Sequence, residues 1–373
     1  MSLFIGLMSG TSMDAVDAAL VAFTGEKTDL LEFYQLPYPA ALRADLLPTC
    51  HPQVPLSLED CGRLSVRIGR LFAAAAQQLL HKAGLKADQI TAIGSHGQTI
   101  LHRPQALDPF TLQIGDPSTI ASLTGITTVA DFRSPDIAAG GQGAPLAPAF
   151  HEAQFRDSSV NRVVLNIGGI ANITVLPADP HLPASGFDTG PGNALLDDWA
   201  QKHLGIPFDK EGQWARQGMI HQELLQGLKL DPYFDLPPPK STGRDHFNLD
   251  WLERILKRMA TPPLPVDVQA SLVRLTTDTI ATAIGRYAPL TDEILVCGGG
   301  AYNPVLLEAL RGALAPCRVD PTAHYGLPPN CIEAVAFAWL AKRRLEGRPG
   351  NLPTVTGARR PLVLGAIYAS NSK

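Results

Sequence analysis

The sequence is poor in cysteine, and the few cysteines it has are scattered. Five occur in 373 residues without any Cys-x-x-Cys pair: Cys50, Cys61, Cys297, Cys317 and Cys331. A disulfide framework needs paired cysteines, and a structural zinc site needs clustered ones. We therefore expect neither, and the pattern predicts a protein of the reducing cytoplasm.

Long apolar runs and an excess of positive charge are also missing. No stretch of about 18 apolar residues occurs, and residues 1–20 carry Asp14 and Asp17 where a signal peptide would be apolar. Lysine and arginine number 31 against 35 aspartates and glutamates, which gives a net charge of −4. The sequence therefore predicts no membrane span and no nucleic acid or anionic lipid as a partner.

Two nucleotide-binding fingerprints are absent as well. Neither G-x-G-x-x-G nor G-x-x-x-x-G-K-[ST] occurs, so no glycine-rich loop of the Rossmann or P-loop type opens a helix. Glycine (33 residues) and proline (32 residues) are nevertheless abundant, and they cluster in short runs. With 45% apolar and 18% charged residues, the composition is that of an ordinary globular protein. At roughly 150 residues per domain, the length corresponds to two or three domains.

Two stretches share a pattern in which a glycine turn separates two apolar strands. The first joins strands at 3–8 and 15–23, and the second joins strands at 162–167 and 171–176 through Gly168-Gly169. Each predicts a β-hairpin. A third glycine turn, Gly298-Gly299-Gly300, follows a predicted strand at 293–297.

Capping residues and apolar periodicity predict the helices between these strands. Ser57 to Asp60 resembles a capping box and Gly84 ends the same helix. Asn303 followed by Pro304 is typical of a helix start. Further elements are predicted as helices at 194–203, 268–287 and 332–345, strands at 90–94 and 127–130, and a proline-rich loop at 235–244. Alternating strands and helices in two similar halves predict an α/β fold.

The repeated pattern suggests two domains with a cleft between them. We expect an N-terminal domain over residues 1–134 and a C-terminal domain over residues 135–373, with the C-terminal tail packing back on the first. A hairpin turn that exposes successive N–H groups can cradle phosphate. Two such hairpins and a late glycine turn are similar to the layout of the hexokinase–Hsp70–actin ATPases, which implies a duplicated, ribonuclease H-like, actin-like ATPase fold.

Several strings resemble the anhydro-N-acetylmuramic acid kinase family, and the resemblance runs nearly end to end. They are residues 10–17 (GTSMDAVD), 95–99 (SHGQT), 113–117 (QIGDP), 131–133 (DFR), 140–146 (GGQGAPL), 166–172 (NIGGIAN), 187–193 (FDTGPGN), 333–334 (EA) and 351–358 (NLPTVTGA). One departure is Ala15, where the family usually has glycine. If that turn needs a positive φ, alanine costs about 1 kcal/mol there.

The resemblance implies an ATP-dependent kinase of peptidoglycan recycling. Such an enzyme opens the 1,6-anhydro ring of 1,6-anhydro-N-acetylmuramic acid with water and phosphorylates O6, giving N-acetylmuramic acid 6-phosphate. ATP and Mg²⁺ are the implied cofactors, and a cytoplasmic homodimer is the implied state. The resemblance places the sugar and phosphate side in the domain over residues 1–134 and the nucleotide side in the domain over residues 135–373.

The resemblance also implies which residues form the site. Met8 and Asn166 stand where other sugar kinases of this superfamily carry aspartates, so Asp188 is the candidate catalytic base. The expected sugar-binding residues are His96, Gln98, Arg133, Asn172 and Glu333. The expected nucleotide-binding residues are Gly10, Thr11, Ser12, Met13, Asp14, Ala15, Val16, Asp17, Gly168, Gly169, Gly298, Gly299 and Gly300, with Asp14 also a candidate for holding magnesium through water.

Simpler interpretations of these residues remain open. Asp188 could cap the helix at 194–203, Asp14 could be a plain turn residue, and Glu333 could only favour its helix N-terminus. Arg133 could form a surface ion pair or bind the lactyl carboxylate of the sugar. His96 could bond to the sugar or, with His102, ligate a metal.

Two rival functions follow from the same fold. One is an actin- or chaperone-class ATPase without a small substrate, and the other is a metal-dependent modification ATPase that uses the two histidines.

Overall fold

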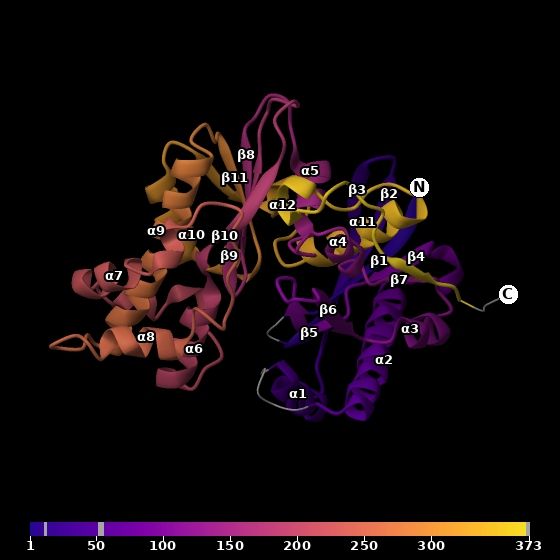
Figure 1. The fold of residues 1–373 in the computed structure, drawn as a ribbon, viewed down its shortest axis with the longest axis horizontal. Coiled ribbons are helices and arrows are strands. Elements are labelled where there is room, and N and C mark those ends of the chain that lie inside the picture. The colour runs from indigo at the N-terminus through magenta and orange to yellow at the C-terminus, as the bar shows by residue number, and fades with distance from the viewer. Residues whose placement is uncertain (11–12, 51–55, 371–373) are drawn as a thin grey trace. The chain divides into compact units, whose positions relative to one another are not determined.

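The computed structural model describes residues 1–10, 13–50 and 56–370, which form two compact units. Unit 1 comprises Met1–Gln154 and Cys331–Lys373, and unit 2 comprises Phe155–Asn330. The colours of Figure 1 follow the chain and show which segments belong to each unit. This division differs from the boundary expected at residue 134, because residues 135–154 belong to unit 1.

A mixed six-stranded sheet forms the centre of unit 1, in the order β13-β7-β4-β1-β2-β3. Strands β1 to β3 form an antiparallel meander, β4 and β7 run parallel to β1, and β13 pairs antiparallel with β7. The strands are β1 (Ser2–Met8), β2 (Ala15–Thr24), β3 (Lys27–Pro37), β4 (Ala92–Ser95), β7 (Thr128–Ala130) and β13 (Ala366–Tyr368), with a separate hairpin of β5 (Gln98–Arg103) and β6 (Phe110–Ile114).

Unit 2 contains a five-stranded sheet in the order β10-β9-β8-β11-β12. Its strands are β8 (Arg162–Ile167), β9 (Ile170–Leu176), β10 (Ser185–Pro191), β11 (Glu293–Cys297) and β12 (Arg318–Pro321). The first three are antiparallel, and β11 and β12 run parallel to β8. Counted along the chain, both units therefore have the strand order 3-2-1-4-5, to which unit 1 adds β13. The shared order confirms the expected duplicated α/β fold.

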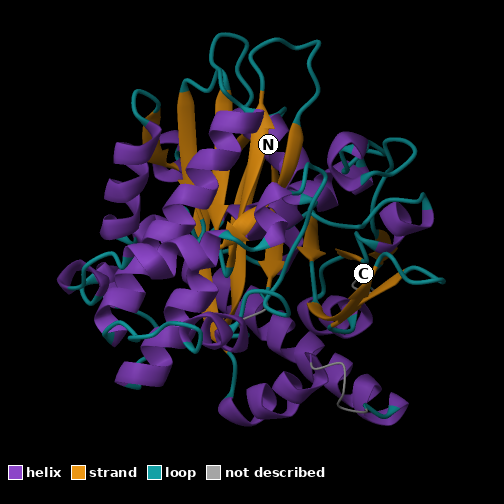
Figure 2. Cartoon of the chain, turned by 60° about the vertical axis from the view of Figure 1, so that its left-hand side comes forward, coloured by secondary structure: helices purple, strands orange, loops and turns teal. Residues whose placement is uncertain are grey.

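Helices surround both sheets (Figure 2). Those from the segments of unit 1 are α1 (Ala40–Leu46), α2 (Leu58–Ala83), α3 (Pro117–Thr124), α4 (Ser134–Ala138), α5 (Ala147–Phe155), which ends at the boundary, α11 (Ile332–Leu345) and α12 (Pro353–Thr356). Those of unit 2 are α6 (Asn193–Leu204), α7 (Gln222–Lys229), α8 (Leu249–Leu256), α9 (Pro265–Tyr287) and α10 (Pro304–Leu314). The predicted caps of α2 are confirmed, because Ser57 accepts from the Asp60 N–H at 3.0 Å and Gly84 is left-handed with φ 66°.

The C-terminal helix α11 belongs to unit 1 because it packs directly on the main chain of the sheet. Gly6 of β1 and Gly94 of β4 are neighbours in register. A Cβ atom on Gly6 would collide with the Ala334 carbonyl of α11, and one on Gly94 with the carbonyl of Phe337. Alternate β1 residues point to the other face of the sheet, where they join the core that includes α2. Helix α11 is therefore one of the two layers that cover this sheet.

A buried carboxylate joins the segment after α11 to residues 133–143. Asp136 is fully buried, and its Oδ1 accepts from Asn351 Nδ2 at 2.6 Å and from Thr356 Oγ1 at 2.7 Å. Its Oδ2 accepts from the Gly143 N–H at 2.7 Å. These bonds place residues 135–143 in unit 1 together with the C-terminal segment.

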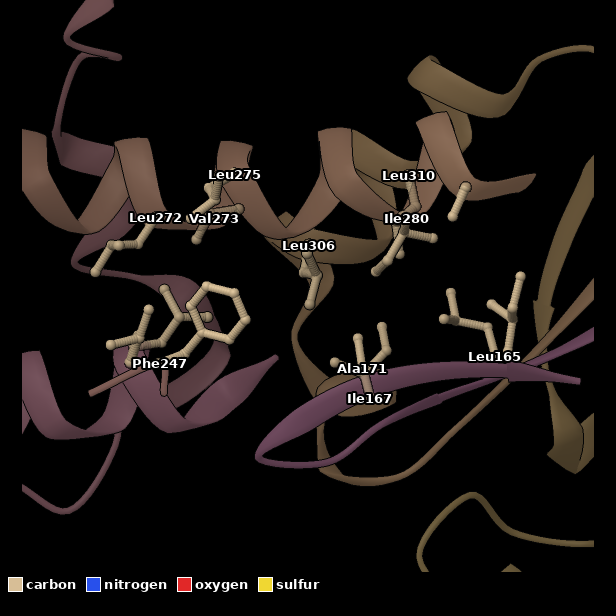
Figure 3. Packing of buried hydrophobic residues seen from close by; sticks show 14 of the residues in the cluster. Leu165, Ile167, Ala171, Phe247, Leu272, Val273, Leu275, Ile280, Leu306 and Leu310 are labelled. Carbon is tan, nitrogen blue, oxygen red and sulfur yellow. The ribbon is translucent and has the colours of Figure 1, made fainter. Parts of the chain in front are cut away.

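The core of unit 2 lies between one face of its sheet and the helices α6, α9 and α10. Leu165 and Ile167 of β8 pack with Leu272 and Ile280 of α9 and with Leu306 of α10 (Figure 3). These strand residues alternate with Val164 and Asn166, which point to the opposite face. Asn166 and its neighbours on that face consequently do not pack into the core formed with the helices.

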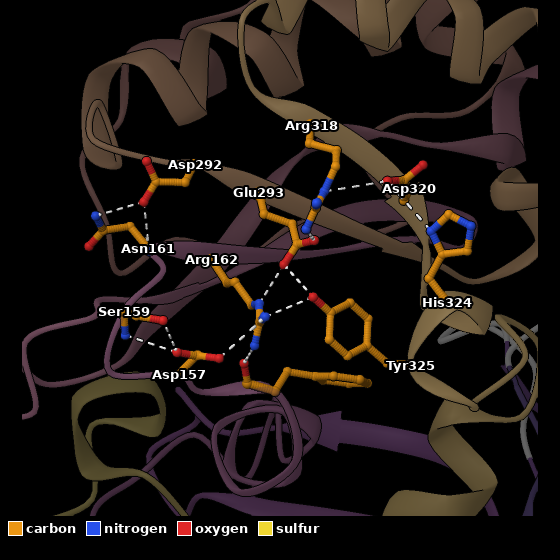
Figure 4. A network of polar contacts seen from close by, with 11 residues as sticks. Asp157, Ser159, Asn161, Arg162, Asp292, Glu293, Arg318, Asp320, His324 and Tyr325 are labelled. Carbon is orange, nitrogen blue, oxygen red and sulfur yellow. Dashed lines mark hydrogen bonds and ion pairs between the residues drawn. The ribbon is translucent and has the colours of Figure 1, made fainter.

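A row of charges fixes the starts of three strands in unit 2 (Figure 4). Arg162, Glu293 and Arg318 are neighbours in register at the beginning of β8, β11 and β12. Arg162 Nε lies 2.5 Å from Glu293 Oε2, Arg318 pairs with Glu293 Oε1, and the Tyr325 hydroxyl donates to Oε2 at 2.8 Å. Because the glycine turns lie at the other ends of β8 and β11, this row anchors the sheet opposite the candidate site.

Candidate functional site

The first glycine turn connects β1 to β2 in unit 1, and it contains the expected phosphate loop. Thr11 and Ser12 lie outside the described residues, while the Met13 N–H donates to the Gly10 carbonyl at 3.2 Å. Met13 adopts a left-handed φ of 52°, whereas Ala15 is the first residue of β2 and has no positive φ. The strain considered for Ala15 is therefore absent, and the unusual backbone lies at Met13. Val16 is buried in the strand that follows.

Asp14, the candidate magnesium contact, is held by an arginine. Its side chain is 70% exposed, and Oδ1 lies 3.3 Å from Arg43 Nη2, while Arg43 Nε donates to the Met13 carbonyl at 3.1 Å. An arginine on one oxygen leaves only the second oxygen for a water of a hydrated magnesium ion. Asp14 thus fits a minor contact to such an ion better than a direct ligand.

Asp17 has an unusual electrostatic environment within β2. Burial raises its pKa to about 6, the Gln35 side chain lowers it by donating to Oδ1 at 2.8 Å, and the negative charge of Glu333 raises it. Asp17 and Glu333 therefore lie close enough to repel. Glu333 sits in the first turn of α11, so unit 1 brings the predicted loop residue and the predicted sugar ligand together.

The buried His96 pairs with the half-buried Arg133, on which the charge of Glu333 also acts. Arg133 Nε donates to His96 Nε2 at 3.1 Å, and Arg133 Nη1 donates to the Gly143 carbonyl at 2.8 Å. Burial, followed by the Arg133 charge, keeps the pKa of His96 well below its usual value, so this imidazole is neutral. Burial lowers the pKa of Arg133 to about 10, and Glu333 is the leading opposing influence. Arg133 thus remains a cation whose orientation is fixed by His96 and by the Gly143 carbonyl.

Gln98 belongs to a second buried cluster of unit 1. Its Oε1 accepts from Ser9 Oγ at 2.6 Å and from the Tyr38 hydroxyl at 3.3 Å, and its Nε2 donates to the Gly10 carbonyl at 3.3 Å. Gln98 is thus bonded to the residue that opens the glycine turn. This contact gives it a role in positioning the turn, in addition to the predicted contact with the sugar.

The two histidines considered as metal ligands are engaged elsewhere. His96 uses Nε2 to accept from Arg133, and His102 Nδ1 lies 3.0 Å from Thr111 Oγ1. Among the residues that the structure describes, no group of three or more His, Cys, Asp or Glu side chains is arranged to hold a metal ion. The geometry therefore favours a hydrogen-bonding role for His96.

In unit 2, three polar residues form a row across neighbouring strands. Asn166 of β8 is opposite Asn172 of β9, and Asn172 is opposite Asp188 of β10. Directly paired residues point to the same face of a sheet, so all three project from the face that does not carry the helical core. The register shifts between Asp188 and Gly190, and such a bulge reorients the side chains beside it.

Asp188 is held by a segment that lies about fifty residues further along the chain. Its Oδ2 accepts from the Thr242 N–H at 3.0 Å, its N–H donates to the Lys240 carbonyl at 3.1 Å, and its carbonyl accepts from the Tyr233 hydroxyl at 2.7 Å. The helix-capping interpretation is wrong, because Asp188 lies inside β10 and Gly192 occupies the N-cap of α6.

The pKa of the Asp188 carboxylate lies close to neutral pH. Burial raises its pKa to about 6, and the Thr242 N–H and the charge of Lys240 partly oppose this increase. A base with a pKa near the working pH is deprotonated for much of the time and still accepts protons readily.

The proline-rich pattern of residues 235–244 predicts only a loop, and it does not predict these contacts with Asp188. The string Lys240-Ser241-Thr242-Gly243-Arg244 after three prolines was the available signal, because a polar, glycine-containing stretch in a fixed loop is typical of binding segments. Arg244 of the same loop lies close to Gly169, since a Cβ atom built on Gly169 would be 3.7 Å from Arg244 Nε. A cation thus lies beside the second glycine turn.

The glycine turns of unit 2 are held by main-chain bonds. The Gly168 carbonyl accepts from the Asn193 N–H at 2.8 Å, and the Gly169 carbonyl accepts from the Gly192 N–H at 3.0 Å. Gly298 is left-handed with φ 78°, and a Cβ there would collide with Asn166 Oδ1, so no other residue fits. Gly299 and Gly300 start a short 3₁₀ helix. The predicted glycine turn after β11 therefore lies against the end of β8.

No helix among the described residues combines the length and apolarity that a bilayer-spanning helix requires.

Comparison with known proteins gives a consistent result over nearly the whole chain. The family model described as anhydro-N-acetylmuramic acid kinase matches residues 2–370. The anhydro-N-acetylmuramic acid kinase of Coxiella burnetii (strain RSA 493 / Nine Mile phase I) is 52% identical over 365 residues, which cover 98% of this chain and 97% of the relative. That of Xylella fastidiosa (strain Temecula1 / ATCC 700964) is 52% identical over 369 residues, covering 98% and 96%.

Solved structures align at lower identity. The activator of the 2-hydroxyisocaproyl-CoA dehydratase from Clostridium difficile, with bound ADPNP, has 12% identity and a TM-score of 0.49, covering 92% of this chain and 96% of that chain. The full-length match to the family model and the identity to its curated relatives decide the assignment: the chain belongs to the anhydro-N-acetylmuramic acid kinase family.

Proposed function

We propose that this protein is an ATP-dependent kinase that opens the 1,6-anhydro ring of 1,6-anhydro-N-acetylmuramic acid and phosphorylates O6. The product is N-acetylmuramic acid 6-phosphate, and the pathway is the recycling of peptidoglycan. Membership of the family supports the substrate and the reaction type. The observation that carries the mechanism is the Asp188 carboxylate, which has a pKa of about 6 and is fixed by the Thr242 N–H.

The substrate itself dictates what the base must do. O6 of a 1,6-anhydro sugar is part of the bridge and carries no proton, so Asp188 takes a proton from water instead. The resulting hydroxyl adds to C1, and the C1–O6 bond breaks with its electron pair passing to O6. O6 then attacks the γ-phosphorus of ATP, and ADP leaves. A carboxylate that activates water against C1 acts as in inverting glycosidases.

We assign sugar binding to polar residues of each unit. Asn172 lies opposite Asp188 in the sheet of unit 2. In unit 1, Arg133 is a cation fixed by His96 and suits the lactyl carboxylate of the sugar. Glu333 and Gln98 supply further acceptors and donors for sugar hydroxyls.

The glycine turns fit a polyphosphate. Gly168 and Gly169 bring no side chain between main chain and ligand, Arg244 supplies a positive charge beside them, and Gly298–Gly300 form a close turn after β11. In unit 1, the corresponding turn begins at Gly10. ATP would supply the phosphoryl group, and magnesium would neutralise phosphate charge, with Asp14 as a water-mediated contact.

A homodimer in the cytoplasm remains part of the proposal on family grounds alone.

The decisive experiment is mass spectrometry of the products after incubation with ATP, Mg²⁺ and 1,6-anhydro-N-acetylmuramic acid. The proposed function requires N-acetylmuramic acid 6-phosphate and ADP in equal amounts. ATP hydrolysis that is independent of the sugar would instead support the chaperone-class ATPase.

A further inference from the structure

A small cavity of about 210 Å³ lies in unit 2, beside the strand that carries Asp188. Its walls come from the second half of α9, from Lys229 at the end of α7, from Thr189 of β10, and from Phe234 and Lys240 of the segment that holds Asp188. Pockets for whole metabolites or drugs usually measure about 300–1,000 Å³. The size of this cavity therefore suits a small ion or a single chemical group.

Two cations line the cavity without a counter-ion. Among the described residues, neither Lys240 nor Arg286 has a carboxylate within ion-pair distance. The Lys240 ammonium donates to the carbonyls of Tyr233 at 3.1 Å and Phe234 at 3.4 Å, and the Arg286 guanidinium lies 5.3 Å from the Tyr287 ring centre. Burial lowers the pKa of Lys240, and the charge of Arg286 lowers it further. The two cations are thus close enough to repel.

The nearby carboxylates do not neutralise this pair. Asp278 is bound by Lys229 on one oxygen and by Arg274, at 2.6 Å, on the other. Asp235 and Asp188 attract Lys240 only from beyond ion-pair distance. The cavity is lined by three cations, Lys229, Lys240 and Arg286, and by two carboxylates, Asp235 and Asp278, so positive charge is in excess there.

A buried hydroxyl without a partner adds a hydrogen-bond donor to the cavity. Tyr287 lines the cavity, and its hydroxyl is buried with no hydrogen-bond partner in the described part of the chain. A buried polar group in that state is costly unless a ligand completes it. As a donor next to two cations, it would be satisfied by an anionic oxygen.

We propose that this cavity binds the phosphate group of a small anion, either inorganic phosphate or a phosphomonoester, between Lys240 and Arg286 with the Tyr287 hydroxyl donating to it. The proposed kinase reaction does not use this site. It is nevertheless connected to the catalytic strand, because the Lys240 carbonyl accepts the Asp188 N–H at 3.1 Å.

Isothermal titration calorimetry of the full chain with inorganic phosphate tests the proposal directly. The titration is done in Mg²⁺ and a saturating non-hydrolysable ATP analogue at physiological ionic strength, so that the γ-phosphate position is already occupied. We expect one phosphate per chain. Arg286→Gln should weaken this binding at least tenfold, since Arg286 is exposed and its replacement leaves the core intact.

Two further variants separate a built site from general charge attraction. Arg258→Gln removes an exposed arginine of the same unit outside the cavity and should bind phosphate like the wild type. Tyr287→Phe should bind phosphate several-fold more weakly and should have a higher Tm without phosphate, because an unsatisfied hydroxyl is removed. A lower Tm would instead place that hydroxyl in a structural bond and remove it from the proposed site.

Glycerol 2-phosphate distinguishes the two sources of the phosphate group. Binding of this ester that is lost in Arg286→Gln identifies a phosphomonoester site, whereas binding of inorganic phosphate alone identifies a site for the free ion. No phosphate on the wild type, equal affinity in Arg286→Gln, or equal loss in Arg258→Gln would each overturn the proposal. The kinase assignment does not depend on any of these results.

Discussion

Replacement of Asp188 by asparagine should remove most of the turnover without weakening the fold. Asparagine keeps the size of the side chain and an oxygen to accept from the Thr242 N–H, which lies 3.0 Å from Oδ2, but it cannot take a proton from water. Loss of a general base costs about 10²–10⁴ in rate, which equals about 2.7–5.5 kcal/mol of transition-state stabilisation. We expect kcat to fall within that range and the Kd for ATP to stay unchanged.

The same substitution carries an expectation for stability. Burial raises the pKa of Asp188 from 3.8 to about 6, so the folded protein binds this proton more tightly than the unfolded chain does. The ionised carboxylate therefore reduces stability, and that reduction appears as the pH rises from about 3.8 through about 6. Asp188→Asn is uncharged throughout, so its Tm should equal or exceed that of the wild type at pH 7 and approach it at lower pH.

The assay combines product analysis by mass spectrometry with calorimetry of ATP binding and of unfolding. Asp250→Asn, the same chemical change at an exposed position in the first turn of α8, is the matched control and should have full activity. A fall in turnover of less than about tenfold, or ~1.4 kcal/mol, would refute the role of Asp188 as base. Joint loss of turnover and Tm would assign it a structural role.

Three further predictions address the reaction and the fold. In ¹⁸O-water, the label should appear on the anomeric oxygen of fresh product, before solvent exchange, and none should enter the transferred phosphate; label in the phosphate contradicts the coupled mechanism. Arg244→Gln should raise the KM for ATP about 10–100-fold in steady-state kinetics, as expected for loss of a hydrogen bond to a charged group, and an unchanged KM would exclude Arg244 from phosphate binding. Glu293→Gln leaves Arg162 buried without its main partner and should cost about 3–5 kcal/mol in urea denaturation. A loss below about 1 kcal/mol would show that Asp157, whose Oδ2 lies 3.5 Å from Arg162 Nη2, compensates. Although burial raises the pKa of Glu293, its bonds to Arg162, Tyr325 and Arg318 hold it below 4.5, so the stability it contributes in the wild type should be lost as the pH falls through that lowered pKa.

Local structure could be predicted where the sequence carries a local signal. The apolar runs of β8 and β11 and the periodicity of α11 predicted the observed bounds, because the strands are almost entirely buried and the helix is buried over most of its length. The domain boundary could not be predicted in this way. Residues 135–154 join unit 1 partly through bonds from Asp136 to Asn351 and Thr356, more than 200 residues away, and a single sequence does not encode such pairs locally.

The residues of the candidate site likewise differ in how far the sequence could predict them. Asp188 was identified from the glycine-rich string around it, but its partners Tyr233, Lys240 and Thr242 were not, because they approach only when the loop folds over β10. Strain was considered at Ala15, yet the left-handed residue is Met13, since the turn type depends on a backbone path that composition does not specify.

The placement of α11 has a consequence for how the protein is made. About 250 residues separate the end of β4 from the end of α11, and at 5–20 residues per second a ribosome needs roughly 10–50 s to synthesise them. During that time the nascent chain already carries β1 and β4, but the glycine-lined face at Gly6 and Gly94 has no helix to cover it. Unit 2 is formed by a single segment of the chain, which is synthesised entirely within the same interval. The second half of this protein can therefore fold cotranslationally before the first, and a premature stop codon ahead of α11 would release a chain whose N-terminal sheet remains open to chaperones and proteases.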